Sequence, residues 1–153
     1  MPDRIARLAD FLPYLMSITS NAVSSHIADE YRARFGLRVP EWRVITVLGH
    51  VGPLTQRELV SGTLMDKVAV NRACKMLEDR GIIARTPNDR DGRSHHLELT
   101  DAGRAVHAEV MPLTFESFER IFAEITQEER ETLKTLLNRI RDGVRNLDGE
   151  AGS

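Results

Sequence analysis

The segment PNDRDGRS carries the side chains best suited to bind a polyanion in this sequence of 153 residues. Arg93 follows Asp91 with only Gly92 between them. A carboxylate at this spacing can hold the planar guanidinium in one direction through charge-assisted hydrogen bonds. Such an arginine suits the narrow minor groove of A·T-rich DNA, where the negative potential is strong. Arg90 lies in the same segment, but a plain polar turn would use similar residues, so the segment alone does not separate the two interpretations.

A second group of side chains that suit DNA lies on a helix predicted from Lys67 to Arg80, with Asp66 as its N-cap. One face of this helix is expected to contact DNA through Lys67, Val68, Asn71, Arg72 and Lys75. Lysine and arginine bind guanine acceptors or phosphates, asparagine can pair with adenine, and valine can contact the methyl group of thymine. The alternative is a solvated helix face stabilised by ion pairs between residues four apart, such as Lys75 and Asp79.

Cys74 is the only cysteine, which excludes an intramolecular disulfide and a metal site built from several cysteines. It lies on the apolar face of the same helix, with Val70, Ala73 and Leu77, and this face is expected to pack on the preceding helices. A cysteine in such a place is usually a buried and unreactive thiol. We therefore expect no redox role for it.

The remaining candidates for metal ligands are the five histidines, His26, His50, His95, His96 and His107. No two of them combine the spacing of one helix face with a nearby carboxylate, which is the pattern of a specific site. No metal site and no cofactor is therefore predicted, and His107→Ala is expected to leave DNA binding almost unchanged. The sequence contains no glycine-rich phosphate loop, HExxH motif or Ser/His/Asp arrangement, so an enzyme is not expected.

Hydrophobic periodicity and capping residues predict the elements that carry these side chains. The predicted helices run from Ile5 to Phe35, from Pro40 to glycine stops at 49 and 52, from Gln56 to Ser61, from Lys67 to Arg80, from the cap Thr100 with a disturbance at Pro112, and from the cap Thr126 to Leu147. Ile82–Arg85 and His95–Leu99 are predicted as two strands on either side of the charged segment. The order helix, short helix, helix and hairpin is that of a winged helix-turn-helix.

Composition limits the class of protein further. Hydrophobic residues make up 41% and charged residues 29%, as in an ordinary globular domain. No apolar run approaches the roughly 20 residues that cross a bilayer, and the N-terminus lacks the basic and then apolar pattern of a secretory signal. The cytoplasm is the expected location, with no membrane partner. The middle of the chain is slightly basic and the last third is acidic, so a polyanion is expected to bind the middle.

The segment from Leu54 to Val106 resembles the MarR family of bacterial transcription regulators. The resemblance is carried by LEDRGII between the predicted helix and strand, by the Asp91-x-Arg93 pair and by LTDAGR at the start of the next helix. It extends over nearly the whole chain. It implies a mainly α (α+β) fold, which is a winged helix-turn-helix with long N- and C-terminal dimerisation helices and a short β-hairpin wing.

The resemblance also divides a single MarR-like domain, residues 1–153, into parts with different tasks. Residues 1–36 and 104–147 are expected to form dimerisation helices, and residues 40–100 are expected to form the DNA-binding lobe. Residues 148–153 are expected to be a frayed tail.

Individual residues receive roles from the same resemblance. The wing arginine of the family enters the minor groove, so Arg93 takes that role and Asp91 orients it. The residues that fall on the recognition helix are Lys67, Asn71, Arg72 and Lys75. Many members have Ser-Thr where this chain has Val68-Ala69, so polar contacts at the start of that helix are not carried over.

A cleft that binds small aromatic or phenolic acids is common in the family, and the resemblance implies a similar cleft here. Its candidate lining residues are Met16, His26, Trp42 and Arg43. An aromatic face next to a cation would suit a carboxylated ring. The alternative is that Trp42 belongs to the hydrophobic core.

The predicted function is that of a dimeric, sequence-specific DNA-binding regulator, a repressor that a small effector releases from an inverted-repeat operator. Two alternatives remain open. In the first, the chain is a winged-helix module that docks protein and carries a conformational or redox switch. In the second, it is a zinc-responsive regulator. A steep dependence of affinity on salt would distinguish DNA binding from protein docking.

Overall fold

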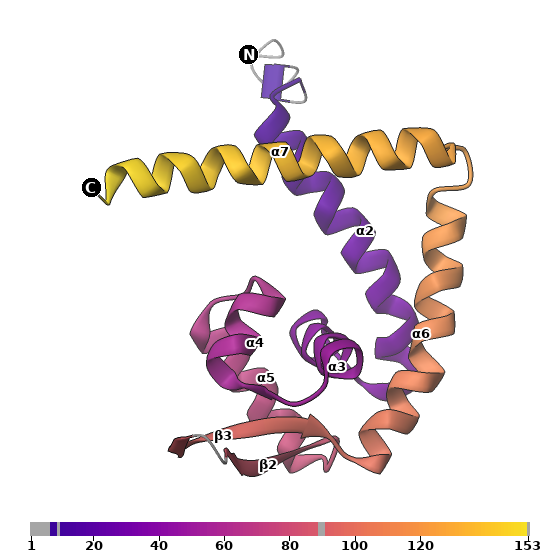
Figure 1. Ribbon diagram of the computed structural model, residues 1–153. Helices are drawn as coiled ribbons and strands as arrows, with labels where there is room; N and C mark the ends of the chain where they lie inside the picture. Colours follow the sequence, from indigo (N-terminus) through magenta and orange to yellow (C-terminus); the bar gives the residue numbers. More distant parts are fainter. Residues whose placement is uncertain (1–6, 9, 89–90, 153) are drawn as a thin grey trace. The chain divides into compact units, whose positions relative to one another are not determined.

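The computed structural model describes residues 7–8, 10–88 and 91–152, and the side chains of residues 88 and 91–93 are outside this description (Figure 1). The helices and strands in chain order are α2 (Leu12–Phe35), α3 (Val39–Val51), β1 (Leu54–Thr55), α4 (Gln56–Thr63), α5 (Lys67–Asp79), β2 (Ile83–Asn88), β3 (Asp91–Leu99), α6 (Asp101–Ile121) and α7 (Gln127–Ala151). They form two compact units, of which the first ends at Ser117 and the second begins at Phe118.

Helix α2 begins at Leu12, so the prediction of one continuous helix from near Ile5 is wrong. Pro13 explains the boundary because it has no N–H to donate and its ring would clash with a carbonyl one turn earlier. In the first turn of a helix neither property is costly. Gly36 ends α2 as predicted, with φ of 62° and its N–H donating to the carbonyl of Arg32 over 2.9 Å.

Helix α3 starts at Val39 with Pro40 in its first turn, as predicted, but it continues through Gly49 and ends at Gly52. Gly49 has a packing role: a Cβ atom there would lie 2.5 Å from the imidazole of His107, which belongs to α6. The same imidazole stacks on Trp42 with 6.5 Å between ring centroids. His107 of α6 therefore packs against α3.

Capping residues define α4 and α5 as the sequence predicts. The Thr55 hydroxyl accepts from the N–H of Glu58 over 3.2 Å, and the Glu58 carboxylate accepts from the N–H of Thr55 over 2.8 Å. This reciprocal pair is a capping box, and α4 extends from it to Thr63. The Asp66 carboxylate accepts from the N–H of Ala69 over 2.8 Å and begins α5.

The wing is a three-stranded antiparallel sheet with the order β1-β3-β2, and the predicted hairpin is its β2-β3 part. The additional strand β1 pairs Leu54 with Leu97. Strands β2 and β3 are longer than predicted, because their pairing extends to Asn88 opposite Asp91. The sheet therefore carries the backbone on both sides of the charged segment.

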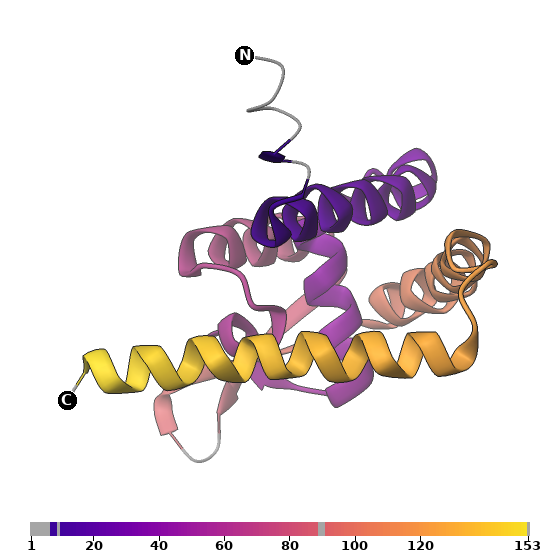
Figure 2. The ribbon, with the colours of Figure 1, turned by 90° about the horizontal axis from the view of Figure 1, so that it is seen from above.

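Helix α3 lies at the centre of the first unit, where it contacts α2, α4, α5 and β3 (Figures 1 and 2). The buried apolar side chains come from every neighbour of α3: Ala28, Tyr31, Leu37, Trp42, Val44, Ile45, Leu48, Leu59, Val70, Ala73, Cys74, Leu77, Ile82, Ile83, Leu97, Leu99 and Val110. Helix α5 is thus anchored by its apolar face, which fixes the direction of its polar face.

The end of α5, the start of β2 and the start of α6 meet at one junction. Gly81 has φ of 70°, which a residue with a side chain rarely adopts. The Thr100 hydroxyl donates to the carbonyl of Gly81 over 2.6 Å and accepts from the N–H of Gly103 over 3.1 Å. Gly103 approaches so closely that a Cβ atom there would lie 2.1 Å from the carbonyl oxygen of Ile82. The LEDRGII and LTDAGR segments therefore pack against each other.

Helix α6 is continuous across Pro112, so the predicted disturbance of the helix there is wrong. A proline inside a helix removes one backbone hydrogen bond. In α6 the turns on both sides of Pro112 remain helical, from Asp101 to Ile121.

In the second unit, Arg130 closes the turn between α6 and α7. Its guanidinium donates to the carbonyl of Phe122 over 2.7 Å, pairs with Glu119 over 3.2 Å and lies 5.3 Å from the ring centroid of Phe118. Helix α7 begins with the predicted capping box at Thr126 and continues to Ala151. Residues 148–151 of the predicted tail are part of this helix.

Candidate nucleic-acid interface

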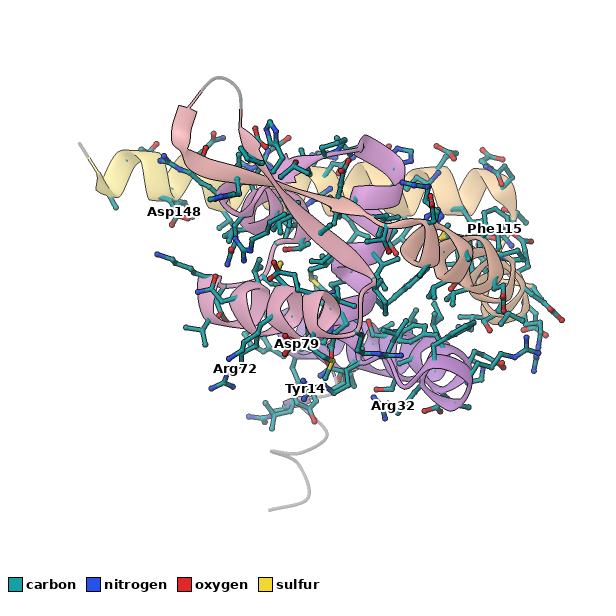
Figure 3. The ribbon with its side chains drawn as sticks, turned by 90° about the horizontal axis from the view of Figure 1, so that it is seen from below. Tyr14, Arg32, Arg72, Asp79, Phe115 and Asp148 are labelled. Atoms are coloured by element: carbon teal, nitrogen blue, oxygen red, sulfur yellow. The ribbon has the colours of Figure 1, made fainter. Side chains whose placement is uncertain are left out.

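The face of α5 that is predicted to contact DNA is exposed in the structure, at Lys67, Val68, Asn71, Arg72 and Lys75. The opposite face lies in the core, with Val70, Ala73, Cys74 and Leu77. Figure 3 shows Arg72 extending outward from the helix. The predicted phase of α5 is therefore confirmed, and its polar face is accessible to a ligand.

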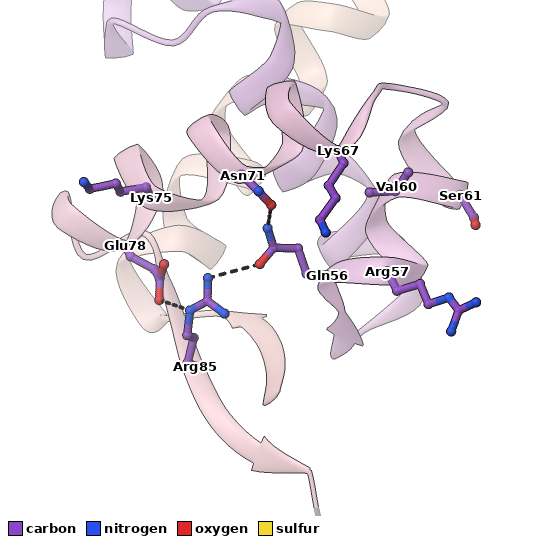
Figure 4. A pocket seen from close by; sticks show the side chains of 9 residues that line it. All are labelled: Gln56, Arg57, Val60, Ser61, Lys67, Asn71, Lys75, Glu78 and Arg85. Atoms are coloured by element: carbon purple, nitrogen blue, oxygen red, sulfur yellow. Dashed lines mark hydrogen bonds and ion pairs between the residues drawn. The ribbon is translucent and has the colours of Figure 1, made fainter. Parts of the chain in front are cut away.

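An open groove of about 980 Å³ is lined by residues of α4, α5 and β2 (Figure 4). The lining residues are Gln56, Arg57, Val60, Ser61, Lys67, Asn71, Lys75, Glu78 and Arg85. Four of them are cationic and one, Glu78, is acidic. A concave surface with this balance attracts anionic groups such as phosphate.

Three polar contacts inside this groove connect the wing to both helices. Arg85 on β2 donates from Nε to Oε1 of Glu78 on α5 over 2.7 Å. It also donates from Nη2 to Oε1 of Gln56, the first residue of α4, over 3.2 Å. Gln56 in turn donates from Nε2 to Oδ1 of Asn71 on α5. Figure 4 draws these contacts as a chain from Glu78 to Asn71.

Gln56 and Arg85 are part of the groove although sequence analysis did not predict them. One signal was present for Arg85. It follows the buried Ile83 by two residues, so both side chains lie on the same face of β2. A cation that lies beside a buried side chain on the same face of a strand needs a polar partner. Glu78 and Gln56 are the partners of Arg85.

The charged tip of the wing is described only in part. Arg90 lies outside the described residues, and the structure gives the backbone of Asp91 and Arg93 as the start of β3. Their side chains are outside the description as well. The roles of Asp91 and Arg93 therefore remain predictions.

The four residues expected around an effector lie on α2 and α3. Trp42 is 7% exposed and is packed between Tyr31, at 5.3 Å between centroids, and His107. Trp42 is thus a core residue, which confirms the alternative interpretation of this side chain. Met16, His26 and Arg43 are exposed. Their role in an effector pocket remains a prediction.

Cys74 is a buried, free cysteine, as expected. Burial raises the pKa of its thiol from 9.0 to about 11, and the nearby Arg85 lowers it only in part. A thiol with a raised pKa is protonated at neutral pH and is a weak nucleophile. The thiol is therefore poorly suited to a redox switch.

The described residues were also compared with what a metal site and a membrane-spanning helix require. Among the residues that the structure describes, no three His, Cys, Asp or Glu side chains come together as a metal site would require. Over the same residues, no helix is both long enough and apolar enough to cross a bilayer.

The arrangement of α4, α5 and the β2-β3 strands defines the class of the protein. A short helix, a turn and a second helix with an accessible polar face, followed by an antiparallel wing, make a winged helix-turn-helix. Long helices precede and follow this lobe.

Comparison with known proteins shows which regulators the chain resembles. The sequence model of the MarR family matches residues 35–94. The transcriptional regulator YdgJ of Bacillus subtilis is 29% identical over 127 residues, which cover 82% of this chain and 77% of that relative. The chain is therefore similar to the MarR family of helix-turn-helix regulators, whose members are DNA-binding transcription regulators.

Solved structures share the fold over most of the chain. A MarR family regulator from Silicibacter pomeroyi superposes with a TM-score of 0.79 at 26% identity, covering 92% of this chain and 94% of its own. A mutant MarR from E. coli in complex with operator DNA superposes with a TM-score of 0.76 at 22% identity, covering 84% of this chain and 92% of its own. The mainly helical winged-helix fold with long terminal helices is therefore confirmed.

Proposed function

We propose that this protein is a homodimeric repressor that binds an inverted-repeat operator and is released from it by a small aromatic acid. The observation that carries the proposal is the polar face of α5, which is accessible while the opposite face is locked into the core. A helix presented in this way fits the major groove of B-DNA, which admits an α-helix.

Electrostatics supports DNA as the partner of this face. Lys67 and Lys75 extend from α5, and Arg57 extends from α4 into the same groove. Cations on both sides of a recognition helix can bind the phosphates that flank the contacted bases. The wing, with Arg90, Asp91 and Arg93 near its tip, is proposed to enter the adjacent minor groove, where arginine is favoured.

Exposed apolar side chains on the terminal helices support a homodimer. No residue of α7 is buried, although large apolar side chains recur along it at three- and four-residue steps: Leu133, Leu136, Leu137, Ile140, Val144 and Leu147. The first half of α2 exposes a similar group: Leu12, Tyr14, Leu15, Met16 and Ile18. Apolar surface of this extent usually marks an interface. We assign residues 1–36 and 104–147 to dimerisation and residues 40–100 to DNA binding.

The names of two relatives support repression and its release. One relative is the repressor IacR of Pseudomonas putida, 23% identical over 68% of this chain and 62% of its own length. Another is BpsR of Bordetella bronchiseptica, 22% identical, whose DNA binding is regulated by 6-hydroxynicotinic acid. An aromatic acid is accordingly the proposed effector class, with Met16, His26 and Arg43 as proposed lining residues of its site. The proposed site of action is the cytoplasm, where bacterial operators lie.

Footprinting on the DNA upstream of the protein's own gene and its neighbours tests the proposal. We expect protection of two half-sites about one helical turn apart, with an affinity that falls steeply as salt rises. Aromatic acids added to the complex should release the DNA and change the fluorescence of Trp42, the single tryptophan. Absence of protection together with a flat salt dependence would favour the protein-docking alternative.

A further inference from the structure

The contacts of Asn71 determine which base edge it can recognise, and a residue outside α5 controls them. Asn71 is an exposed residue of the recognition helix, and its Oδ1 accepts a hydrogen bond from Nε2 of Gln56. Gln56 is the first residue of α4, fifteen positions away in the chain, and is half-buried. The orientation of Asn71 is thus imposed by another element.

The donors and acceptors of each side chain determine the direction of the hydrogen bonds that link Arg85, Gln56 and Asn71. A guanidinium has only donors, so the end of Gln56 that faces Nη2 of Arg85 must be its oxygen, Oε1. The NH₂ group of Gln56 therefore faces Asn71, and the atom of Asn71 that receives it must be an acceptor, Oδ1. Arg85 is itself held by Glu78, which accepts from its Nε over 2.7 Å.

The result is an asymmetric Asn71 amide. Its carbonyl end is turned toward Gln56, so the NH₂ end is the part that is left for a base. Pairing with adenine in the usual two-bond manner needs both ends, because N6 of adenine donates and N7 accepts. Two donors without an acceptor instead suit O6 and N7 of guanine or O4 of thymine, which are acceptors.

We propose that Gln56 is a positioning residue that sets the base preference of the recognition helix, by turning the NH₂ end of Asn71 toward a keto-bearing base in the operator. This rests on the proposed function, since it requires α5 to lie in the major groove. Glu78 and Arg85 are also needed for this positioning. Glu78 holds Arg85, and Arg85 fixes which end of Gln56 faces Asn71 (Figure 4).

Gln56→Glu keeps a hydrogen bond between residue 56 and Asn71 but reverses its direction, so that Asn71 becomes the donor. A carboxylate still accepts from Arg85, but its second oxygen can only accept from Asn71, so Asn71 must rotate and offer its NH₂ end to residue 56. The carbonyl of Asn71 then faces the DNA and suits the amino group of adenine or cytosine. The fold should tolerate the change, because an acidic side chain in the first turn of a helix is favourable.

The charge that Gln56→Glu adds needs a matched control. Ser61→Glu places the same charge on the same helix and in the same groove. It should weaken binding to every duplex alike through repulsion of phosphate. Thermal unfolding of each variant shows whether the lobe remains folded.

The experiment uses competition titrations against duplexes in which each half-site position carries all four base pairs in turn. Asn71→Ala should lose discrimination at one position, which identifies the base pair that Asn71 contacts. At that position the wild type should favour guanine or thymine, and Gln56→Glu should shift the preference toward adenine or cytosine by roughly tenfold. Ser61→Glu should keep the wild-type preference.

Two results would overturn the inference alone. One is a Gln56→Glu protein that keeps the wild-type preference at the position lost in Asn71→Ala. The other is an Asn71→Ala protein that loses discrimination nowhere although the wild type binds specifically. If the wild type shows no base preference at any position, the proposed function fails and the inference fails with it.

Discussion

Gly103, in the first turn of α6, lies directly against the carbonyl of Ile82 at the start of the wing, so closely that a Cβ atom on residue 103 would come within 2.1 Å of that oxygen. The contact brings the beginning of α6 onto the end of the α5-to-β2 connection. The Thr100 hydroxyl bridges the same two segments, because its single proton is shared between the carbonyl of Gly81 at 2.6 Å and that of Ile82 at 3.1 Å. The position of the wing relative to the recognition helix therefore depends on a glycine in α6.

We expect Gly103→Ala to lower the free energy of unfolding by roughly 1–3 kcal/mol, because the new methyl group meets a backbone atom that cannot move aside. Gly143→Ala is the matched control. Gly143 also lies inside a helix, but a Cβ atom there would meet nothing within 4 Å. That variant should gain up to about 1 kcal/mol from helix propensity. Urea unfolding of both proteins measures the difference, and an equal effect of the two substitutions would contradict the packing argument.

Local signals in the sequence predicted the starts of several helices well. The capping boxes at Thr55 and Thr126 lie where the sequence places them, because a cap depends on residues only three apart. The buried and exposed faces of α5 also follow from its own periodicity. Strand β1 was missed because two residues are too few to show alternation and their pairing depends on β3.

Long-range contacts could not be predicted in the same way. Arg85 and Gln56 lie 29 positions apart, and only the folded wing brings them together. The same holds for Gly49, which looks like a helix stop until His107 of α6 is packed on it. Side-chain positions at the tip of the wing are outside the description, so the predicted Asp91–Arg93 pair still needs a direct test.

His107→Ala should destabilise the first unit by roughly 1–2 kcal/mol, because it leaves space against Gly49 and removes the ring that stacks on Trp42. The emission maximum of Trp42 should move to longer wavelength as water approaches its ring. His95→Ala serves as the control, since His95 is an exposed residue of β3. Chemical unfolding followed by tryptophan emission tests both variants. A His107 variant as stable as the wild type would show that the stack contributes nothing.

Stability should fall at alkaline pH because of Cys74. Burial raises the pKa of its thiol from 9.0 to about 11, so the folded state resists ionisation that the unfolded chain permits. The contribution of the protonated thiol to the free energy of unfolding is fully present below pH 9. It is lost as pH rises toward 11, at up to about 1.4 kcal/mol per pH unit. Burial likewise raises the pKa of Tyr31 to about 12, which extends the loss above pH 10.

Cys74→Ala separates this contribution from that of other groups. Between pH 9 and 10 the variant should lose less stability than the wild type, although alanine leaves a small cavity at every pH. Urea unfolding at pH 7.5, 9 and 10 provides the comparison. Parallel pH profiles for the two proteins would mean that the thiol ionises equally in the folded and unfolded states.

The proposed dimer predicts the effect of a charge on α7. Ile140→Asp places a carboxylate among exposed apolar side chains that we assign to the interface, so the variant should sediment as a monomer at micromolar concentration. Arg139→Asp introduces the same side chain at the neighbouring exposed position, on a different face of the helix, and should leave the dimer intact. If the wild type itself sediments as a folded monomer, the assignment of the terminal helices to dimerisation is wrong.

Arg93→Ala tests the proposed role of the wing. Removing a guanidinium that enters the minor groove should weaken operator binding by roughly 1–3 kcal/mol, and Asp91→Ala should have a smaller effect because it removes the group that orients the cation and not the cation itself.

Lys75→Ala, if Lys75 binds phosphate, should weaken operator and scrambled DNA equally and lower the slope of log affinity against log salt by about one. Arg34→Ala removes the same charge from an exposed position of α2 and should change neither quantity. Fluorescence titrations with operator and scrambled duplexes give all four values. Wild-type affinity in the Arg93 variant would mean that the wing tip is only a polar turn, and DNA recognition would then rest on α5 and the cations of its groove.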